Sequence, residues 1–218
     1  MQHYKREEDS VIFEYLKDQN INGDLLDIGA RKGNWYKQFK THYPKNTAHL
    51  FEPTPNIAEY LNKNYNKFKN VNIHGIALSD QAGEFDFHIN KDKPAWSGLV
   101  KHPNHSYTTV KVPVKTVDDF GFQNVSVMKI DVEGNEYRTL RGASTTILMN
   151  KPIIYFECAD VHLHNYSNTS RDVFEFLKMF KYNILDLDMK NLTVDDFANH
   201  TASKPSYYHN FIAHVWIP

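Results

Sequence analysis

Short apolar runs alternate with amphipathic stretches along most of the chain. An apolar run of about four to eight residues that ends at turn residues is typical of a buried strand, whereas apolar residues three or four positions apart are typical of a helix packed on a sheet. The pattern predicts strands at 24–27, 47–51, 71–77, 125–130, 152–156, 182–187 and 210–217. It predicts helices at about 8–19, 35–39, 56–64, 137–141 and 169–180.

Capping and turn residues bound several of these elements. Asp9 or Ser10 can cap the first helix, and Thr169 opens a Thr-x-x-Asp capping box before the last one. The segments 84–89 and 109–114 alternate strictly between apolar and polar residues, so we expect a pair of strands beside or on the main sheet. The polar stretch between these two segments is long for a loop in a compact domain, which favours a functional role.

The alternation of strands and helices predicts the fold class. It is typical of an α/β fold, in which a mostly parallel sheet is covered by helices on both faces. Such sheets bind ligands at the carboxyl ends of their strands, where the strand order reverses. We therefore expect the carboxylates that end predicted strands to converge at one rim, and these are Asp27, Glu52, Asp131 and Glu157.

A glycine-containing turn follows the first of these strands. Gly29 and Gly33 let the backbone turn sharply and let a ligand come close, and the next predicted helix begins directly after them. The DxGxxxG spacing differs from the GxGxxG of dinucleotide folds, and Asp27 would repel a pyrophosphate. A carboxylate there suits a cationic amino group, which favours S-adenosylmethionine over NAD. An ordinary strand, turn and helix of any α/β domain remains the alternative.

Glu52 supports a nucleoside-containing ligand. It lies 25 residues after Asp27, at the end of the next predicted strand. An acidic residue in that position can accept hydrogen bonds from both hydroxyl groups of a ribose. The two carboxylates together therefore favour a ligand that carries both an amino group and a ribose.

The composition of the chain favours a single globular domain and disfavours nucleic acid and membrane partners. The 218 residues are 41% hydrophobic and 23% charged, which suits one domain with a core over 22–218. A net charge of −1 gives no general attraction to nucleic acid or anionic lipid, so we expect no nucleic acid partner. The single cysteine, Cys158, lies among apolar residues, which indicates a buried structural thiol. The polar start and the lack of a long apolar run predict no signal peptide, no membrane span and a soluble, intracellular protein.

Several motifs occur together in a recognisable order. They are Asp27-Ile-Gly-Ala-Arg-Lys-Gly-Asn-Trp35, Phe51-Glu-Pro53, Ala77-Leu-Ser-Asp80, Thr116-Val-Asp-Asp119, Lys129-Ile-Asp-Val-Glu-Gly-Asn-Glu136 and Leu140-Arg-Gly-Ala143. From about Leu25 to Glu157 the chain resembles the FkbM family of S-adenosylmethionine-dependent O-methyltransferases. The resemblance implies a Rossmann-like class I methyltransferase fold with a mostly parallel seven-stranded sheet, helices on both faces, an antiparallel C-terminal strand and a small β-hairpin insertion. It also implies methyl transfer to hydroxyl groups, often of sugars or natural products.

The resemblance also implies roles for individual residues. The methionine part of the cofactor would be held by Asp27, Gly29, Ala30, Arg31, Gly33 and Asn34. Glu52 would hold the ribose, and Ser79 or Asp80 the adenine. Asp131 would contact the cofactor beside the transferred methyl group, with Glu133 close to it, and S-adenosyl-L-homocysteine would be the product. Arg31 departs from the family, which commonly has a smaller polar residue at this position.

Three residues are candidates for catalysis. Asp131 is the expected base for the acceptor hydroxyl, and the alternative is that it only binds cofactor or stabilises the next turn. His162 and Glu157 are the other candidates, and the alternative for His162 is a solvated or structural role. Glu133 is expected to hold the N–H groups at the following helix start, and the alternative is a catalytic role. It is also a candidate for substrate binding. Asp131, Glu157 and His162 could also bind a divalent metal, but no compact ligand motif supports this, so we expect no metal.

Two segments are candidates for acceptor binding. Polar and apolar residues alternate from 160 to 164, outside the family pattern, so an extended backbone there would point Asp160, His162 and His164 the same way. Trp96 and Ser97 lie in the long polar loop, where the ring of Trp96 or of Tyr107 can pack on a sugar ring. The alternative is that these two aromatic residues only anchor the loop.

The expected function is methyl transfer to a sugar hydroxyl of a glycan or glycosylated metabolite. A lipid, polyketide or peptide acceptor is the alternative within the same chemistry. A non-catalytic cofactor-binding module is a third hypothesis, which the retained acidic rim disfavours. The chain is a whole protein or a domain of a longer enzyme, fused to or associated with glycosyltransferase domains. It is expected in the cytoplasm, or in the host cytoplasm if a virus encodes it.

Overall fold

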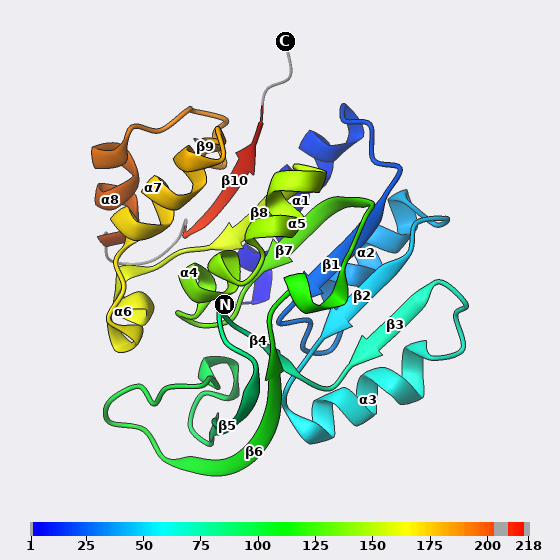
Figure 1. Cartoon of the computed structure of the whole chain (residues 1–218), viewed down its shortest axis with the longest axis vertical. Helices are drawn as coiled ribbons and strands as arrows, with labels where there is room; N and C mark the ends of the chain where they lie inside the picture. The colour runs from blue at the N-terminus through cyan, green and yellow to red at the C-terminus, as the bar shows by residue number, and fades with distance from the viewer. Residues whose placement is uncertain (1, 203–208, 216–218) are drawn as a thin grey trace.

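The computed structural model describes residues 2–202 and 209–215, with side chains from residue 9 onward (Figure 1). A central sheet has the strand order β3-β2-β1-β7-β8-β10-β9. Its strands are β1 Asp24–Ile28, β2 Ala48–Phe51, β3 Val71–His74, β7 Val125–Ile130, β8 Ile153–Glu157, β9 Asn183–Leu185 and β10 Asn210–His214. β1 pairs in parallel with β2 and β7, whereas β10 is antiparallel to both of its neighbours. This arrangement confirms the predicted mostly parallel seven-stranded sheet with an antiparallel C-terminal strand.

Helices cover both faces of this sheet. One face is covered by α1 Gln2–Lys17, α2 Asn34–His42 and α3 Pro55–Tyr65. The other face is covered by α4 Glu136–Arg141, α5 Ser144–Asn150, α7 Ser170–Met179 and α8 Val194–Ala202. Successive side chains of a strand point to opposite faces, so Leu25 of β1 packs with the first group and Leu26 with the second. The strands are continuous apolar runs because their side chains pack into a hydrophobic core on each face of the sheet.

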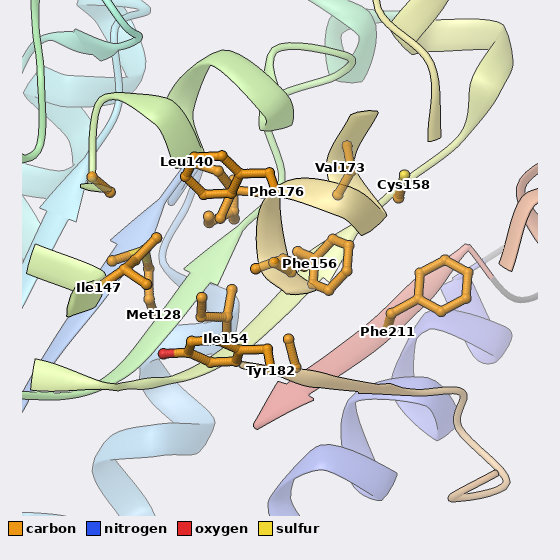
Figure 2. Packing of buried hydrophobic residues seen from close by; sticks show 14 of the residues in the cluster. Met128, Leu140, Ile147, Ile154, Phe156, Cys158, Val173, Phe176, Tyr182 and Phe211 are labelled. Atoms are coloured by element: carbon orange, nitrogen blue, oxygen red, sulfur yellow. The ribbon is translucent and has the colours of Figure 1, made fainter. Parts of the chain in front are cut away.

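Figure 2 shows the core on the side of α4, α5 and α7. Met128 and Ile154 from the sheet pack with Leu140, Ile147 and Phe176 from these helices. Cys158 is fully buried in the same cluster, which confirms the predicted structural thiol. The predicted capping box is also present at the start of α7.

A second, three-stranded sheet has the order β4-β6-β5 and lies beside the main one (Figure 1). Its long strands, β5 Gly83–Asn90 and β6 Tyr107–Lys115, form the predicted hairpin, and their connection carries the 3-10 helix η1 Pro94–Trp96. The predicted single strand at 71–77 is wrong. β3 ends at His74, and after Gly75 the chain leaves the main sheet, so β4 Ala77–Leu78 pairs with β6 instead.

Other element boundaries also differ from the prediction. α1 begins at Gln2, so Asp9 and Ser10 lie inside it and do not cap it, because the good helix formers of 5–8 extend the helix. Residues 160–164 are helical, in α6 Asp160–Leu163 and η3 His164–Tyr166, so the predicted extended segment is wrong. The helices α5 and α8 and the 3-10 helix η2 Asp118–Phe120 were not predicted. Of the strand predicted at 210–217, the last two residues lie outside the described residues.

Candidate active site

The carboxyl ends of β1, β2 and β7 open onto a cleft of about 630 Å³, counting its open mouth. β1 and β7 are neighbours in the sheet although they are distant in sequence, so the strand order reverses there, as it does where open α/β sheets bind ligands. The predicted site residues that line this cleft are Gly29, Arg31, Glu52, Ser97, Asp131 and Glu133. Its apolar walls include Ile57, Ile76, Ala77, Leu78, Phe87 and Leu99.

The turn between β1 and α2 needs glycine at two positions. Gly29 has a φ of +79°, and a Cβ on it would lie 1.9 Å from the carbonyl oxygen of Asp131. Gly33 has a φ of +71°, and a Cβ there would lie 2.9 Å from the ring of Tyr65. Only a residue without a side chain allows these approaches. The turn therefore packs directly against the backbone that follows β7, and both segments form one wall of the cleft.

Glu52 joins two turns at the mouth of the cleft. Its carboxylate accepts hydrogen bonds from the backbone N–H of Arg31, at 2.9 Å, and from that of Thr54, at 2.8 Å. The residue is 4% exposed, yet it lines the cleft. Each carboxylate oxygen has two lone pairs, so Glu52 can still accept hydrogen bonds from ligand hydroxyl groups.

A lysine lies between the two central carboxylates. Lys129 Nζ is 3.7 Å from Asp27 Oδ1 and 3.4 Å from Asp131 Oδ2, and it donates a hydrogen bond to the carbonyl of Gly29 at 3.0 Å. Asp27 is fully buried just beneath the cleft and does not line it. Burial raises the pKa of the Asp27 carboxyl, and the positive charge of Lys129 offsets part of that rise.

An acidic cluster, formed by Asp131, Glu133 and Glu157, lies at one end of the cleft. One carboxylate oxygen from each lies within 4.8 Å of the others. His162 Nδ1 is 3.6 Å from Glu133 Oε2. Burial lowers the pKa of His162 to about 4, so the imidazole is neutral at pH 7 and is a weak base. Of the three predicted catalytic residues, Asp131 and Glu157 belong to this cluster and His162 lies beside it.

Glu136 supports the turn that carries the cluster. Its Oε1 accepts hydrogen bonds from the N–H groups of Val132, at 3.0 Å, and Gly134, at 3.2 Å. These two N–H groups lie in the turn before α4, so the Glu136 carboxylate holds the turn that leads into this helix. Glu133 is turned toward His162, with a φ of +57°. Burial raises the pKa of Glu136 to about 7.

Aromatic and imidazole rings form the rim beside the cluster. The Trp96 ring lies 5.1 Å from that of His162 and 5.4 Å from those of His102 and His105, measured between centroids. Lys93 Nζ lies 3.7 Å from the Trp96 ring centroid, within the range of a cation–π contact. Lys93, Trp96, His102 and His105 come from the loop that connects β5 to β6, whereas His162 lies in α6, so this loop contacts α6 at the end of the cleft.

Other predicted site residues lie outside the cleft. Ala30 is buried behind it, and Asn34 is exposed at the start of α2. The cleft is lined by Ala77 and Leu78 and not by the next two residues, Ser79 and Asp80.

The contacts of Ser79 and Asp80 explain why they do not line the cleft. The Ser79 hydroxyl points toward Asn135, at 3.5 Å from its Oδ1. Asp80 pairs with Arg141 at 3.3 Å. Both side chains therefore face the β7–α4 side of the fold.

The segment 160–164 sends its polar side chains in different directions because it is helical. His162 points into the region of the acidic cluster, whereas His164 is exposed. Asp160 accepts hydrogen bonds from the N–H of Ser170 at 2.9 Å and from the hydroxyl of Thr201 at 3.1 Å. Its carboxylate thus connects α6 with α7 and α8 and does not line the cleft.

Sequence reasoning missed three residues with roles at the site. Lys129 is a charged residue inside the apolar run of β7, which is itself a signal of a paired buried charge. Glu136 belongs to the same motif as Asp131, but nothing in the sequence shows that its carboxylate accepts hydrogen bonds from two backbone N–H groups. Tyr166, whose hydroxyl accepts a hydrogen bond from the N–H of Leu99 at 3.0 Å, was not singled out, because its partner is 67 residues away.

Solved structures resemble this chain over nearly its whole length. The FkbM methyltransferase from Methylobacillus flagellatus KT matches with a TM-score of 0.58 and 15% identity, over 95% of this chain and 47% of that chain. Precorrin-6y C5,15-methyltransferase from Geobacter metallireducens GS-15 matches with a TM-score of 0.50 and 12% identity, over 96% of this chain and 87% of that chain. Sheet order and site position together define a Rossmann-like methyltransferase fold.

A family model described as the methyltransferase FkbM domain matches residues 27–184. The chain therefore belongs to the FkbM family of S-adenosylmethionine-dependent methyltransferases. It spans about half of the length of the Methylobacillus protein. No curated protein matches its sequence. Within the described residues, none of the helices combines the length and the apolar character needed to cross a membrane.

Proposed function

We propose that this domain transfers a methyl group from S-adenosylmethionine to a hydroxyl group of a sugar. The observation that carries the proposal is the position of the acidic cluster, at the end of the cofactor cleft and beside the ring of Trp96. Carboxylates can orient hydroxyl groups and accept their protons, and an aromatic face suits the apolar side of a sugar ring. An acceptor bound there would meet the carboxylates of Asp131 and Glu133, which line the cleft, and would have the Trp96 ring behind the lining residues Ala95 and Ser97.

The cleft offers a matching partner for each part of the cofactor. Glu52 would accept hydrogen bonds from the ribose, and the apolar side chains of Ile57, Ile76 and Leu78 would pack around the adenine. The backbone at Gly29, where no Cβ intervenes, would lie beside the methionine part, above the buried Asp27. Ala77 and Leu78 thus replace Ser79 and Asp80 as the proposed adenine contacts.

The residues of the chain would mainly position the acceptor and take its proton. When bound, S-adenosylmethionine supplies a methyl group on a positively charged sulfur. The acceptor oxygen forms the new bond to the methyl carbon while the carbon–sulfur bond breaks, and the electron pair of that bond stays on sulfur. Asp131 takes the hydroxyl proton, and Lys129, 3.4 Å away, favours the ionised carboxylate that this role needs.

A transfer assay tests the acceptor class. The protein is incubated with methyl-labelled S-adenosylmethionine and a panel of mono- and oligosaccharides, lipids and peptides, and the products are read by mass. We expect a sugar to gain one methyl group. Transfer to a lipid, a polyketide or a peptide alone would replace the sugar by that acceptor, and cofactor binding without transfer to any acceptor would favour a non-catalytic module.

Replacement of Asp131 tests its role as the base. Asp131→Asn removes the proton acceptor but keeps the shape, so we expect turnover to fall roughly 10²- to 10⁴-fold while cofactor affinity stays within about a few-fold. Glu84→Gln, an exposed substitution on β5, is the matched control and should leave both quantities unchanged. Turnover that is unaffected by Asp131→Asn would contradict the assignment.

The partners of the domain follow from the proposed acceptor. Because glycosyltransferases build the glycans that would carry a sugar acceptor, we propose that this domain is fused to or associated with glycosyltransferase domains. A cytoplasmic location agrees with its buried, free cysteine. Co-purification with a glycosyltransferase from the native source would test this association.

A further inference from the structure

We propose that the acidic cluster and His162 form a binding site for a divalent cation. Asp131 and Glu133 follow β7, Glu157 ends β8, and His162 lies in α6, so three segments bring the four side chains together. The inference rests on the proposed function, because it assigns a role to the end of the cleft where the acceptor hydroxyl would bind. It replaces the sequence-based expectation of no metal, which was made without Glu133 as a candidate ligand.

The spacing of the carboxylates fits a single ion. One oxygen from each of Asp131, Glu133 and Glu157 lies within 4.8 Å of the others. Oxygen ligands lie about 2.0–2.6 Å from Mg²⁺ or Ca²⁺, so two ligands on opposite sides of one ion are about 4–5 Å apart. One cation can therefore contact all three residues with little movement of their side chains.

His162 provides an observation that is independent of the carboxylates. The residue is 9% exposed, and its Nδ1 atom has no hydrogen-bond partner within the described part of the chain. This atom points at the cluster, 3.6 Å from Glu133 Oε2. A buried polar nitrogen without a hydrogen bond costs free energy, and a metal ion bound by that nitrogen would remove the cost. The imidazole thus faces the cluster from the side of Glu133, and a small movement of its side chain would make it a fourth ligand.

Backbone contacts hold the cluster in place. Glu133 adopts a left-handed backbone conformation, which turns its side chain toward His162. A Cβ on the next residue, Gly134, would lie 2.5 Å from the carbonyl oxygen of His162, so the turn after β7 packs directly on α6. The carboxylates and the imidazole therefore come from backbone segments in contact with each other, which favours a preformed site.

Ligand chemistry indicates the kind of cation. Carboxylate oxygens suit Mg²⁺, Mn²⁺ and Ca²⁺, and the addition of an imidazole makes Mn²⁺ the most suitable probe of this group. The bound cation would attract the oxygen of the acceptor hydroxyl and lower its pKa. Each cluster residue would give one oxygen to the metal, so the second oxygen of Asp131 could still take the proton.

Direct measurement of Mn²⁺ binding tests the site without an activity assay. The 218-residue chain is titrated into MnCl₂, and loss of the electron paramagnetic resonance signal of free Mn²⁺ reports binding. We expect about one Mn²⁺ per chain, and we expect Glu157→Gln and Glu133→Gln each to weaken the affinity about tenfold or more. Glu84→Gln, which changes an exposed carboxylate on β5, should bind Mn²⁺ like the wild type.

Cofactor binding separates failure of the metal site from failure of the proposed function. Binding of S-adenosylmethionine by each variant is measured by calorimetry, and a variant that still binds it is folded. The metal site is wrong if the wild type takes up no Mn²⁺, or if both variants bind Mn²⁺ as tightly as the wild type. Mn²⁺ binding by a protein that methylates no acceptor would keep the site and reject the proposed function.

Discussion

Glu136 is a carboxyl group whose ionisation opposes folding. Burial raises its pKa from 4.5 to about 7, so the folded chain holds this proton more tightly than the unfolded chain. The resulting stabilisation is complete below pH 4.5 and is lost as the pH rises through 7. Between pH 5 and pH 8 we expect the wild type to lose roughly 2–3 kcal/mol relative to Glu136→Gln, in which this group cannot ionise. Urea unfolding at both pH values measures the difference.

An exposed carboxyl group serves as the control for the pH dependence that Glu136 gives to the free energy of unfolding. Glu84→Gln should follow the pH dependence of the wild type, because the Glu84 side chain is exposed. In Glu136→Gln the side-chain amide oxygen can still accept hydrogen bonds from the N–H groups of Val132 and Gly134, so the variant should keep the fold. If the stability of Glu136→Gln and that of the wild type change in parallel from pH 5 to pH 8, Glu136 does not titrate in this range.

At the residue scale, the sequence predicts which carboxylates reach the site but not what each one contacts. Glu52 and Asp131 follow strands and line the cleft, as the convergence of parallel strand ends requires, whereas Asp27 near the end of β1 lies buried beneath it. The direction of the Glu133 side chain depends on a left-handed backbone conformation at this residue, a conformation that is uncommon for a glutamate. The sequence alone gives no reason to expect it.

The contact between the β1–α2 turn and the β7–α4 turn depends on Gly29. In Gly29→Ala the new Cβ would lie 1.9 Å from the Asp131 carbonyl oxygen, so the two turns must separate. We expect a loss of stability of roughly 3 kcal/mol or more, together with about a tenfold or greater loss of cofactor affinity. Thermal unfolding and calorimetric titration with S-adenosylmethionine measure the two effects.

A second glycine separates this clash from backbone strain. Gly121 also has a positive φ, +61°, but a Cβ there would meet nothing within 4 Å. Gly121→Ala should therefore cost only about 1–2 kcal/mol and leave cofactor affinity unchanged. If Gly29→Ala and Gly121→Ala changed stability and cofactor affinity equally, the close contact between the β1–α2 and β7–α4 turns would be unimportant for both quantities.

Asp160 links three helices, so its removal should affect stability and not acceptor binding. Asp160→Ala leaves the N–H of Ser170 at the start of α7 and the hydroxyl of Thr201 in α8 without this partner. We expect a loss of roughly 2–3 kcal/mol in urea unfolding with an unchanged KM for the acceptor. Asp195→Ala, which removes an exposed ion pair with Arg171, should cost less than about 1 kcal/mol. A raised KM at unchanged stability would restore Asp160 as an acceptor-binding residue.

The segment from Asp160 to His164 shows what limits prediction at the element scale. Its alternation of polar and apolar residues is that of a strand, but tertiary contacts select a short helix. The carboxylate of Asp160 and the packing of Leu163 into the core both require that helix. Ser170, which donates to Asp160, and the core residues around Leu163 lie outside this segment of five residues. The pattern within the segment therefore could not predict these contacts.

At the scale of the whole molecule, strand periodicity and motif order predict the architecture. The strand order, the antiparallel β10 and the coverage of both faces agree with the expectation. The hairpin of β5 and β6 agrees as well, but the position of β4 was not predicted, because it depends on pairing with β6, 37 residues later at Ala77 and Val114. That sheet and the loop between β5 and β6 contribute Leu78, Phe87 and Ser97 to the lining of the cleft, so this wall of the site is the part least accessible to sequence patterns.

Cofactor binding should stabilise the whole fold, because the cleft joins both sheets and the turns after β1, β2 and β7. At a concentration of S-adenosylmethionine about 100 times its Kd, mass action adds about 2.7 kcal/mol, which corresponds to a rise in Tm of roughly 5–10 °C for a chain of this size. If Glu52→Gln weakens binding about tenfold, it should show about half of this rise at the same concentration, while the exposed Glu59→Gln keeps all of it. NAD should leave Tm unchanged, since Asp27 lies beneath the turn where its pyrophosphate would bind. An equal shift with NAD would mean that the acidic strand ends do not select a cationic ligand.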